Sequence, residues 1–231
     1  MNRELTAPAP SALLNEWLTP LQFSFALPQL PALATAPRGS GEPVLVWPGF
    51  GAGNASTVIL RRFLRYLGHD PRGWPLGRNN GDVLAMLGAL GNELERVAAS
   101  GPVNLVGWSL GGYLAREVAR DYPHLVKRVI TLGSPVVGGP TYTAVASFFN
   151  SQPGALDDIE RAVDERYQIP LQVPVTAIYS KVDGVVAWQA CNDQHSPDVE
   201  HVEVTSSHVG LGFAPQALRV VADRLALRPQ N

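Results

Sequence analysis

The chain has 231 residues, of which 45% are hydrophobic and 16% charged, so it can bury one large core as a single α/β domain. Eighteen basic residues against 20 acidic ones give a net charge of −2 without a basic stripe, which argues against nucleic acid as a partner. The single cysteine, Cys191, excludes an intrachain disulfide and fits a reducing compartment. With no signal-peptide pattern and no apolar stretch of transmembrane length, we expect a cytoplasmic protein.

Residues 1–41 are expected to form an N-terminal arm that is rich in proline and alanine. Apolar residues run from position 12 to position 33, but the prolines among them exclude one long helix. Ser11 is placed to cap a short helix over residues 12–18. Two roles stay open for this arm: it packs on the core, or it acts as a flap that contacts a membrane surface.

From residue 42 to residue 231 we expect one domain in which strands and helices alternate. Apolar runs predict strands over residues 44–47, 103–106, 126–132, 173–179 and 199–204. Helical periodicity predicts helices over residues 56–67, 83–98, 110–121 and 215–227, and residues 68–81 are turn-rich. Such alternation predicts an α/β fold with a mostly parallel sheet, right-handed crossovers and helices on both faces.

One serine lies at the tip of a predicted strand-to-helix turn. Gly107-Trp108-Ser109-Leu110-Gly111 follows the strand over residues 103–106 and opens the next helix. Glycines two positions on either side of Ser109 let strand and helix approach closely. The turn then exposes the serine hydroxyl beside unpaired backbone N–H groups. Ser109 is therefore our candidate nucleophile, which needs a base nearby.

An acid and a base each follow a later strand of the predicted sheet. Asp183 comes four residues after the strand that ends at residue 179, and His208 comes four after the strand that ends at residue 204. The carboxyl ends of parallel strands meet at one edge of a sheet, and the chain order serine, aspartate, histidine suits this type of elbow. His208 would take the serine proton, and Asp183 would orient the imidazole. Asp193 and Asp198 are the reserve acids.

The turn after the first strand offers backbone donors for an oxyanion. The sequence Pro48-Gly49-Phe50-Gly51 follows the strand over residues 44–47. We expect the oxyanion to be bound by the backbone N–H groups of Leu110 and Phe50, with Gly51 as the second choice for the latter. The glycines of this turn lack the spacing of a phosphate-binding loop.

These motifs resemble the α/β-hydrolase superfamily, and within it small bacterial lipases and carboxylesterases. The resemblance covers residues 42 to 227 and rests on the following residues: Trp47-Pro48-Gly49-Phe50-Gly51, Gly107 to Gly112, Thr131-Leu132-Gly133-Ser134-Pro135, Asp183 and His208. Many lipases carry His-Gly in the oxyanion turn where this chain has Pro48-Gly49. Because the donor is a backbone group, the same chemistry is possible with Pro48-Gly49 in this turn.

The resemblance also implies an insertion that caps the site. Residues 138–172 are long for a plain crossover and carry apolar residues. We expect one or two cap helices there, with an apolar face toward the site. Four aromatic residues are candidates for substrate binding: Trp108, Trp188, Phe148 and Phe149. For Trp108 and Trp188, packing in the core is the alternative.

The sequence therefore predicts a serine hydrolase that cleaves carboxylic esters with hydrophobic acyl chains, acting on a small-molecule or lipid ester through an acyl-enzyme. An acyltransferase or thioesterase would use the same three residues and is the first alternative. A non-hydrolytic or binding member of the fold is the second. No pattern of metal ligands is visible, and we expect no cofactor. The oligomeric state is left open.

Overall fold

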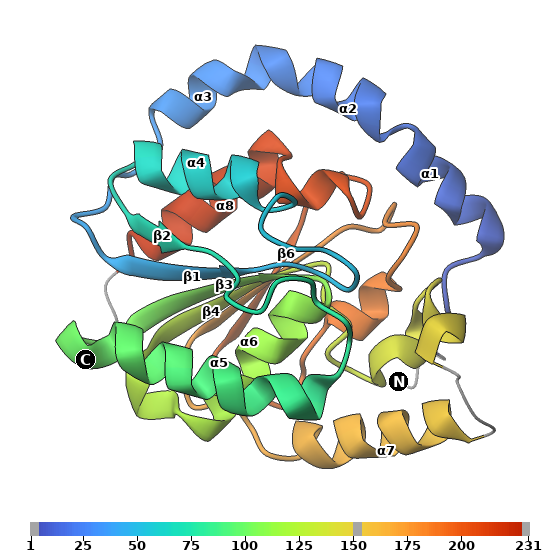
Figure 1. The fold of residues 1–231 in the computed structure, drawn as a ribbon. Coiled ribbons are helices and arrows are strands. Elements are labelled where there is room, and N and C mark those ends of the chain that lie inside the picture. The colour runs from blue at the N-terminus through green and yellow to red at the C-terminus, as the bar shows by residue number, and fades with distance from the viewer. Residues whose placement is uncertain (1–4, 150–153, 228–231) are drawn as a thin grey trace.

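The computed structural model describes residues 5–149 and 154–227, and within them six strands form a single parallel sheet (Figure 1). The strand order is β2-β1-β3-β4-β5-β6. The strands are β1 (Pro43–Trp47), β2 (Asp70–Arg72), β3 (Val103–Trp108), β4 (Val126–Leu132), β5 (Val175–Tyr179) and β6 (Val199–Glu203). The predicted α/β class with a parallel central sheet is confirmed.

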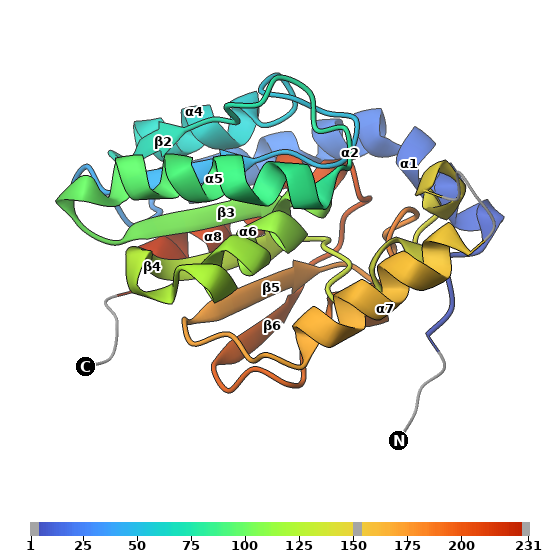
Figure 2. The same cartoon turned by 60° about the horizontal axis from the view of Figure 1, so that its bottom comes forward.

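Helices cover both faces of this sheet. Figure 1 shows α4 and α8 above the sheet and α5 and α6 below it. In Figure 2, α7 lies next to α6 and runs toward the side of the molecule where α1 lies. The helices of the domain are α4 (Val58–Tyr66), α5 (Val83–Val97), α6 (Leu110–Asp121), α7 (Ala155–Tyr167) and α8 (Pro215–Leu225).

The core has two halves because successive side chains of a strand point to opposite faces of the sheet. In β1, Val44 and Val46 belong to the cluster that packs against α4 and α8, whereas Leu45 and Trp47 belong to the cluster against α5 and α6. All four side chains are at most 1% exposed. Strands buried on both faces are continuous apolar runs, which is why these segments were recognisable in the sequence.

The structure contains one strand that the sequence did not predict, and it contradicts one predicted helix cap. The turn-rich segment over residues 68–81 contains the short strand β2, which pairs with β1 at the edge of the sheet. Its three residues include Pro71, and proline is tolerated in an edge strand because one side of the strand needs no donors. Ser11 caps no helix, because a 3-10 turn over Pro10–Leu13 precedes α1 (Leu14–Trp17), whose N-cap residue is Leu13.

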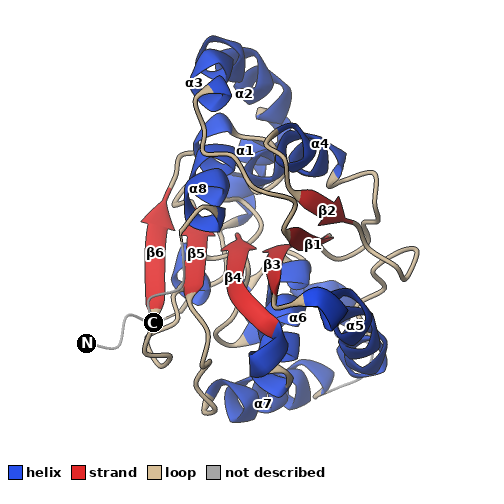
Figure 3. Cartoon of the chain, turned by 90° about the vertical axis from the view of Figure 1, so that its left-hand side faces the viewer, coloured by secondary structure: helices blue, strands red, loops and turns tan. Residues whose placement is uncertain are grey.

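The N-terminal arm is a string of short helices that curves around one side of the domain. After α1 come α2 (Thr19–Ala26), a 3-10 turn over Leu27–Gln29 and α3 (Leu30–Ala34). Figure 1 shows the arm passing outside α4 and α8, and Figure 3 shows α2 and α3 at the end of the molecule beyond α8. The prolines therefore interrupt the helix as expected, while Pro20 and Pro31 are accommodated in the first turns of α2 and α3.

The expected cap region, residues 138–172, forms two 3-10 turns and one α-helix in its described part. The turns cover Gly139–Tyr142 and Ala146–Phe149, and the helix is α7. Residues 150–153 lie outside the described residues. Whether this region acts as a cap, and where its boundaries lie, stays a prediction.

Candidate active site

Ser109 lies in a strained backbone conformation between β3 and α6. Among the described residues it is the only non-glycine residue with a positive φ, at 56° with ψ −126°. Such strain persists only where the surroundings enforce it, and it concentrates at functional sites. The backbone here turns sharply from strand to helix, and Ser109 is the N-cap residue of α6. This places its hydroxyl at the positive end of the helix dipole.

Glycines make this turn sterically possible. A Cβ on Gly107 would overlap the backbone of Gly111, and a Cβ on Gly111 would overlap the backbone of Trp47 and lie 2.6 Å from the Pro48 carbonyl oxygen. A Cβ on Gly112 would overlap the Ser134 hydroxyl. Strand, helix and neighbouring turn therefore meet at distances that only glycine allows.

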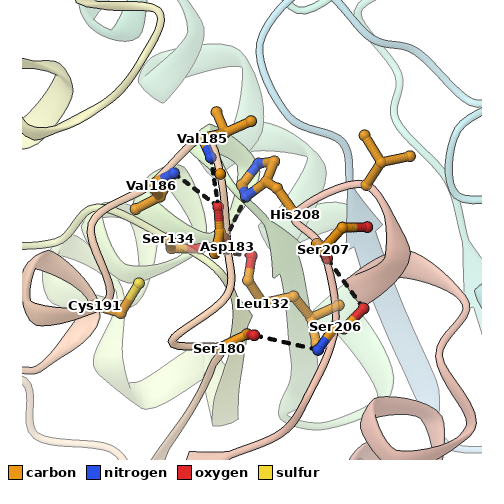
Figure 4. A network of polar contacts seen from close by, with 12 residues as sticks. Leu132, Ser134, Ser180, Asp183, Val185, Val186, Cys191, Ser206, Ser207 and His208 are labelled. Carbon is orange, nitrogen blue, oxygen red and sulfur yellow. Dashed lines mark hydrogen bonds and ion pairs between the residues drawn. The ribbon is translucent and has the colours of Figure 1, made fainter. Parts of the chain in front are cut away.

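Asp183 and His208 form a buried hydrogen-bonded pair (Figure 4). Asp183 Oδ2 lies 2.7 Å from His208 Nδ1, and the two residues are each 6% exposed. The other carboxylate oxygen, Oδ1, accepts hydrogen bonds from the backbone N–H groups of Val185 and Val186, both at 2.8 Å. Because both oxygens have partners, the carboxylate is fixed in orientation and so fixes the imidazole.

The charge around His208 favours its protonated form. Burial alone lowers the pKa of the imidazole, because it disfavours the charged state. The ion pair and hydrogen bond with Asp183, together with the negative charge of Glu16, outweigh burial and raise the pKa of His208 above its ordinary value.

The pair lies next to β3, which ends directly before Ser109. The Trp108 indole N–H donates to the His208 carbonyl oxygen at 3.1 Å, and the two rings lie 6.0 Å apart. Gly133 follows β4, the neighbour of β3, and a Cβ there would lie 3.0 Å from Asp183 Oδ2 and 3.1 Å from His208 Nδ1. Among the described residues no hydrogen bond joins the Ser109 hydroxyl to His208. Such bonds are often long in enzymes without substrate and shorten when it binds.

The turn after β1 lies against Ser109. A Cβ on Gly49 would be 3.0 Å from the Ser109 Cβ and 3.5 Å from its hydroxyl oxygen. The Gly51 N–H donates to the Asn79 carbonyl at 2.7 Å and is therefore occupied. The Phe50 and Leu110 N–H groups, in contrast, donate to no acceptor in the part of the chain that is described. Of the two donors considered for this turn, Phe50 is therefore the better candidate.

Asn79, which the sequence did not single out, holds this turn in place. It is fully buried, and its side-chain amide donates to the Pro48 carbonyl at 3.0 Å. Its backbone N–H donates to the Ala52 carbonyl at 2.8 Å, and its side-chain oxygen accepts from Gly81 at 3.2 Å. The dipeptide Asn79-Asn80 indicated only a turn, and the sequence held no signal that the first asparagine would be buried.

Ser109 lines a mostly apolar cavity of about 430 Å³. Phe50 and Leu110 also line it, and α7 and the turns before it form much of its wall. Apolar residues from these elements and from α5 and the Asp183 loop complete the lining: Leu84, Leu87, Val145, Phe149, Ile159, Val163, Val185 and Val186. Arg166, a cation in the wall, is paired with Glu117 and Asp121.

The four aromatic candidates fall in different places. Phe149 lines the cavity and its ring lies 4.8 Å from that of Phe50. Phe148 is 72% exposed, with its ring 6.2 Å from Phe50. Trp108 packs on His208, and Trp188 stacks on Tyr179 at 5.8 Å. Of these four described residues, only Phe149 contributes to the wall of the cavity.

The reserve acids lie in other surroundings. Asp193 is buried in an ion pair with Arg116, and its side chain also accepts from the His195 and Ser196 N–H groups. Burial raises the pKa of this carboxyl, but Arg116 and these hydrogen bonds outweigh burial and hold the pKa well below its ordinary value. Asp198 is exposed and precedes β6, at the opposite end of the strand from His208.

The described residues hold neither a cluster of metal ligands nor a membrane-spanning helix. No group of three or more His, Cys, Asp or Glu side chains is arranged to hold a metal ion in residues 5–149 and 154–227. Within the same ranges, no helix combines the length and the apolar character needed to cross a membrane.

Known proteins resemble this chain in sequence and in fold. A family model described as the alpha/beta hydrolase fold matches residues 64–168. A pimeloyl-[acyl-carrier protein] methyl ester esterase of Photobacterium profundum is 33% identical over 146 residues, which are 61% of this chain and 54% of that esterase. The chain thus matches about half the length of this relative, and only 5% of two Armillaria orsellinic acid synthases that are 30% identical over 116 residues.

Solved structures share the fold at low sequence identity. A monoacylglycerol lipase from Paleococcus ferrophilus superposes with a TM-score of 0.63 at 14% identity, covering 81% of this chain and 96% of that one. An alpha/beta superfamily hydrolase from Oenococcus oeni superposes with a TM-score of 0.61 at 16% identity, covering 81% and 92%. The sheet order, the serine turn between β3 and α6 and these similarities show that the chain has the α/β-hydrolase fold.

Proposed function

We propose that the protein is a serine hydrolase that cleaves carboxylic esters with hydrophobic acyl chains, using Ser109, His208 and Asp183. The observation that carries the proposal is a strained serine on the wall of an apolar cavity, beside a buried aspartate–histidine pair. The roles of the three residues follow from their chemistry, because a serine hydroxyl is a weak nucleophile until a base takes its proton.

In the first half of the reaction, the Ser109 oxygen attacks the ester carbonyl carbon and His208 Nε2 takes the hydroxyl proton. Asp183 accepts the other ring N–H and stabilises the imidazolium that forms. The tetrahedral intermediate collapses, the bond to the alcohol oxygen breaks, and His208 returns the proton to the leaving alcohol. In the second half, His208 deprotonates a water that attacks the acyl-enzyme, and the acid leaves as Ser109 is reprotonated.

The oxyanion of each tetrahedral intermediate would be held by the Leu110 and Phe50 N–H groups. The first lies at the start of α6, and the second lies in the turn that contacts Ser109. Donors fixed in advance stabilise the charge as it develops, and the loss of one such donor raises the barrier by about 3 kcal/mol.

The cavity supports an apolar acyl chain rather than a charged one. Its volume of about 430 Å³ lies in the range of small-ligand sites, and its wall is mainly aliphatic and aromatic. Arg166 is paired with Glu117 and Asp121, so its charge is compensated within the protein. The Photobacterium relative is named as a methyl ester esterase, which supports an ester as the substrate.

The proposal is tested with a fluorophosphonate probe and a panel of p-nitrophenyl esters graded by chain length. We expect the probe to label the wild type and Ser100→Ala, an exposed serine control, but not Ser109→Ala. Ester turnover should fall by about 10⁶-fold in Ser109→Ala while the fold is retained. Absence of labelling and of turnover in the wild type would end the proposal.

The same assay separates hydrolysis from acyl transfer. Acyl thioesters and added alcohols are offered beside the esters, and products are identified by mass. Free acid as the main product from esters supports the hydrolase. Faster turnover of thioesters, or acyl transfer to the alcohol in preference to water, would instead identify a thioesterase or an acyltransferase that uses the same residues.

A further inference from the structure

One carboxylate of the N-terminal arm binds both loops of the aspartate–histidine pair. Glu16, in α1, accepts hydrogen bonds from the Gly184 N–H at 3.0 Å and the His208 N–H at 2.8 Å through Oε1. Its Oε2 accepts from the Val209 N–H at 2.9 Å. Gly184 directly follows Asp183, so the carboxylate joins the loop of the acid to the loop of the base. Hydrogen bonds to an ionised acceptor are about twice as strong as neutral ones.

Neighbouring side chains of the arm make further polar contacts with the same two loops. Thr19 and Ser207 hydroxyls lie 2.8 Å apart, and Gln22 Oε1 accepts from the Ser207 N–H at 3.0 Å. The Asn15 side-chain amide donates to the Val182 carbonyl at 3.1 Å. These residues recur at helical spacing along α1 and α2, so they share the face turned toward the loops.

The loops are shaped to receive the arm. A Cβ on Gly184 would overlap the carbonyl oxygen of Ala12. Gly184 therefore marks a place where the backbone of the arm approaches the backbone of the domain more closely than a side chain would permit.

The polarity of α1 is the reverse of that of an ordinary surface helix. The large apolar side chains in and directly after α1 are exposed, with Leu14 at 65%, Trp17 at 83% and Leu18 at 49%. A helix that packs only to shield a core buries its apolar residues instead. Hydrophobic burial therefore does not explain why α1 lies here, whereas the hydrogen bonds to the two loops do.

We propose that Glu16 is a positioning residue, which sets the relative placement of the acid and base loops from the N-terminal arm. This inference rests on the proposed function, because it assigns the placement to catalysis by Ser109, His208 and Asp183. Glu16 touches backbone groups and not the reacting atoms. Its loss should therefore affect the chemical step through geometry, to which catalysis is sensitive at the scale of 1 Å.

Three variants test the proposal. Glu16→Ala removes all three acceptor bonds. Glu16→Gln keeps one carbonyl oxygen, which can still accept from Gly184 and His208. Glu95→Gln is the matched control, since Glu95 is an exposed acid near the end of α5. Circular dichroism and thermal unfolding establish that each variant is folded. The readouts are kcat and KM for an ester, and hydrogen exchange by mass spectrometry over residues 180–186 and 205–212.

We expect kcat to fall by about 10- to 100-fold in Glu16→Ala with little change in KM, and by less in Glu16→Gln. Hydrogen exchange in both loops should become about 10-fold faster or more in Glu16→Ala, because the released amides face solvent. The increase should be smaller in Glu16→Gln. The control should match the wild type in both measurements. A rise in KM alone, or loops that exchange at the wild-type rate in Glu16→Ala, would overturn the proposal.

Failure of the proposed function has a different signature. If the wild type hydrolyses no ester and takes up no fluorophosphonate, the hydrolase assignment fails. Hydrogen exchange still decides whether Glu16 ties the loops together in that case, because it needs no substrate.

Discussion

The two halves of the candidate site are held in place by different means. Ser109 is positioned by its immediate neighbours, because Gly107, Gly111 and Gly112 let β3, α6 and the turn after β1 close around it. The Asp183–His208 pair lies on two long loops after β5 and β6. Those loops are joined to each other by the pair itself and, through Glu16, by a helix 192 residues away from His208 in the chain.

This difference matters for how each half responds to change. The serine turn is fixed by steric exclusion in a close-packed interior, which leaves few alternatives. The loops are fixed by hydrogen bonds from α1 and its neighbours, where Leu14 and Trp17 are exposed, so their geometry depends on a contact that can open locally without unfolding the sheet. Substitutions at the glycines of the first half should therefore affect fold and activity together, and those in the second half mainly activity.

After the loss of Ser109 itself, the largest expected effect is in the second half, at the acid. Asp183→Asn keeps the shape of the side chain but replaces an acceptor with an amide, which favours the wrong imidazole tautomer. We expect kcat to fall by about 10⁴-fold while the fold is retained. Asp198→Asn, at an exposed reserve acid, is the control and should retain wild-type turnover. Near-normal turnover in Asp183→Asn would move the acid elsewhere.

The two halves of the site also differ in how well they could be predicted from the sequence. The turn around Ser109 was predictable because its constraints are local: a buried strand, glycines at fixed offsets and a helix, all within residues 103–121. The sheet was predictable for the same reason, except for β2, whose three residues carry no strand pattern. Asp183 and His208 could be proposed from their positions after strands, but the distance between their side chains could not be predicted.

The contacts of Glu16 and Asn79 could not be predicted from the sequence. Each depends on which distant segment folds beside it, and a single acid between Leu14 and Trp17 has the same pattern as any surface residue. Asn79 is similar, because its burial depends on the packing of the turn after β1 against residues 74–82. Tertiary contacts of polar side chains leave no periodic signal, whereas apolar faces do.

A second prediction tests the serine turn, which is fixed by steric exclusion. Gly111→Ala introduces a Cβ against the Trp47 and Pro48 carbonyls, so the oxyanion turn must move away from Ser109. We expect a loss of about 1–3 kcal/mol in the free energy of unfolding, as for other overpacked sites. Turnover should fall by about 100-fold.

The chain offers a matched control for that substitution. Gly88 lies in the exposed part of α5, and no atom lies within 4 Å of a Cβ built there. Gly88→Ala should stabilise the helix by about 0.5–1 kcal/mol and leave turnover unchanged. Denaturant unfolding and ester kinetics measure both effects. If Gly111→Ala behaved like Gly88→Ala, steric exclusion would not be what fixes the serine turn.

A third prediction concerns the buried asparagine that supports the oxyanion turn. Asn79→Ala removes the donor to the Pro48 carbonyl and the acceptor for the Gly81 N–H, leaving buried backbone groups unpaired. We expect about 1–3 kcal/mol of destabilisation and about a 10-fold lower kcat. Asn80→Ala, at the exposed neighbour, is the control. Wild-type kcat in a folded Asn79→Ala variant would show that the turn needs no such support.

The smallest expected effect is a shift in the pH dependence, which again concerns the second half. Catalysis needs the neutral imidazole, and Asp183 and Glu16 outweigh burial to raise the pKa of His208. The acid limb of kcat/KM should therefore lie above pH 6.5, the ordinary histidine value, and activity should fall as the pH drops through that limb.

The same raised pKa of His208 stabilises the folded state. This contribution to stability is complete below the unfolded-state pKa and is lost as the pH rises through the folded-state pKa. Stability and activity should thus change in opposite directions across this range. Rate profiles and denaturant unfolding at matched pH values measure both, and an acid limb below pH 6 would contradict the assigned balance of charge and burial.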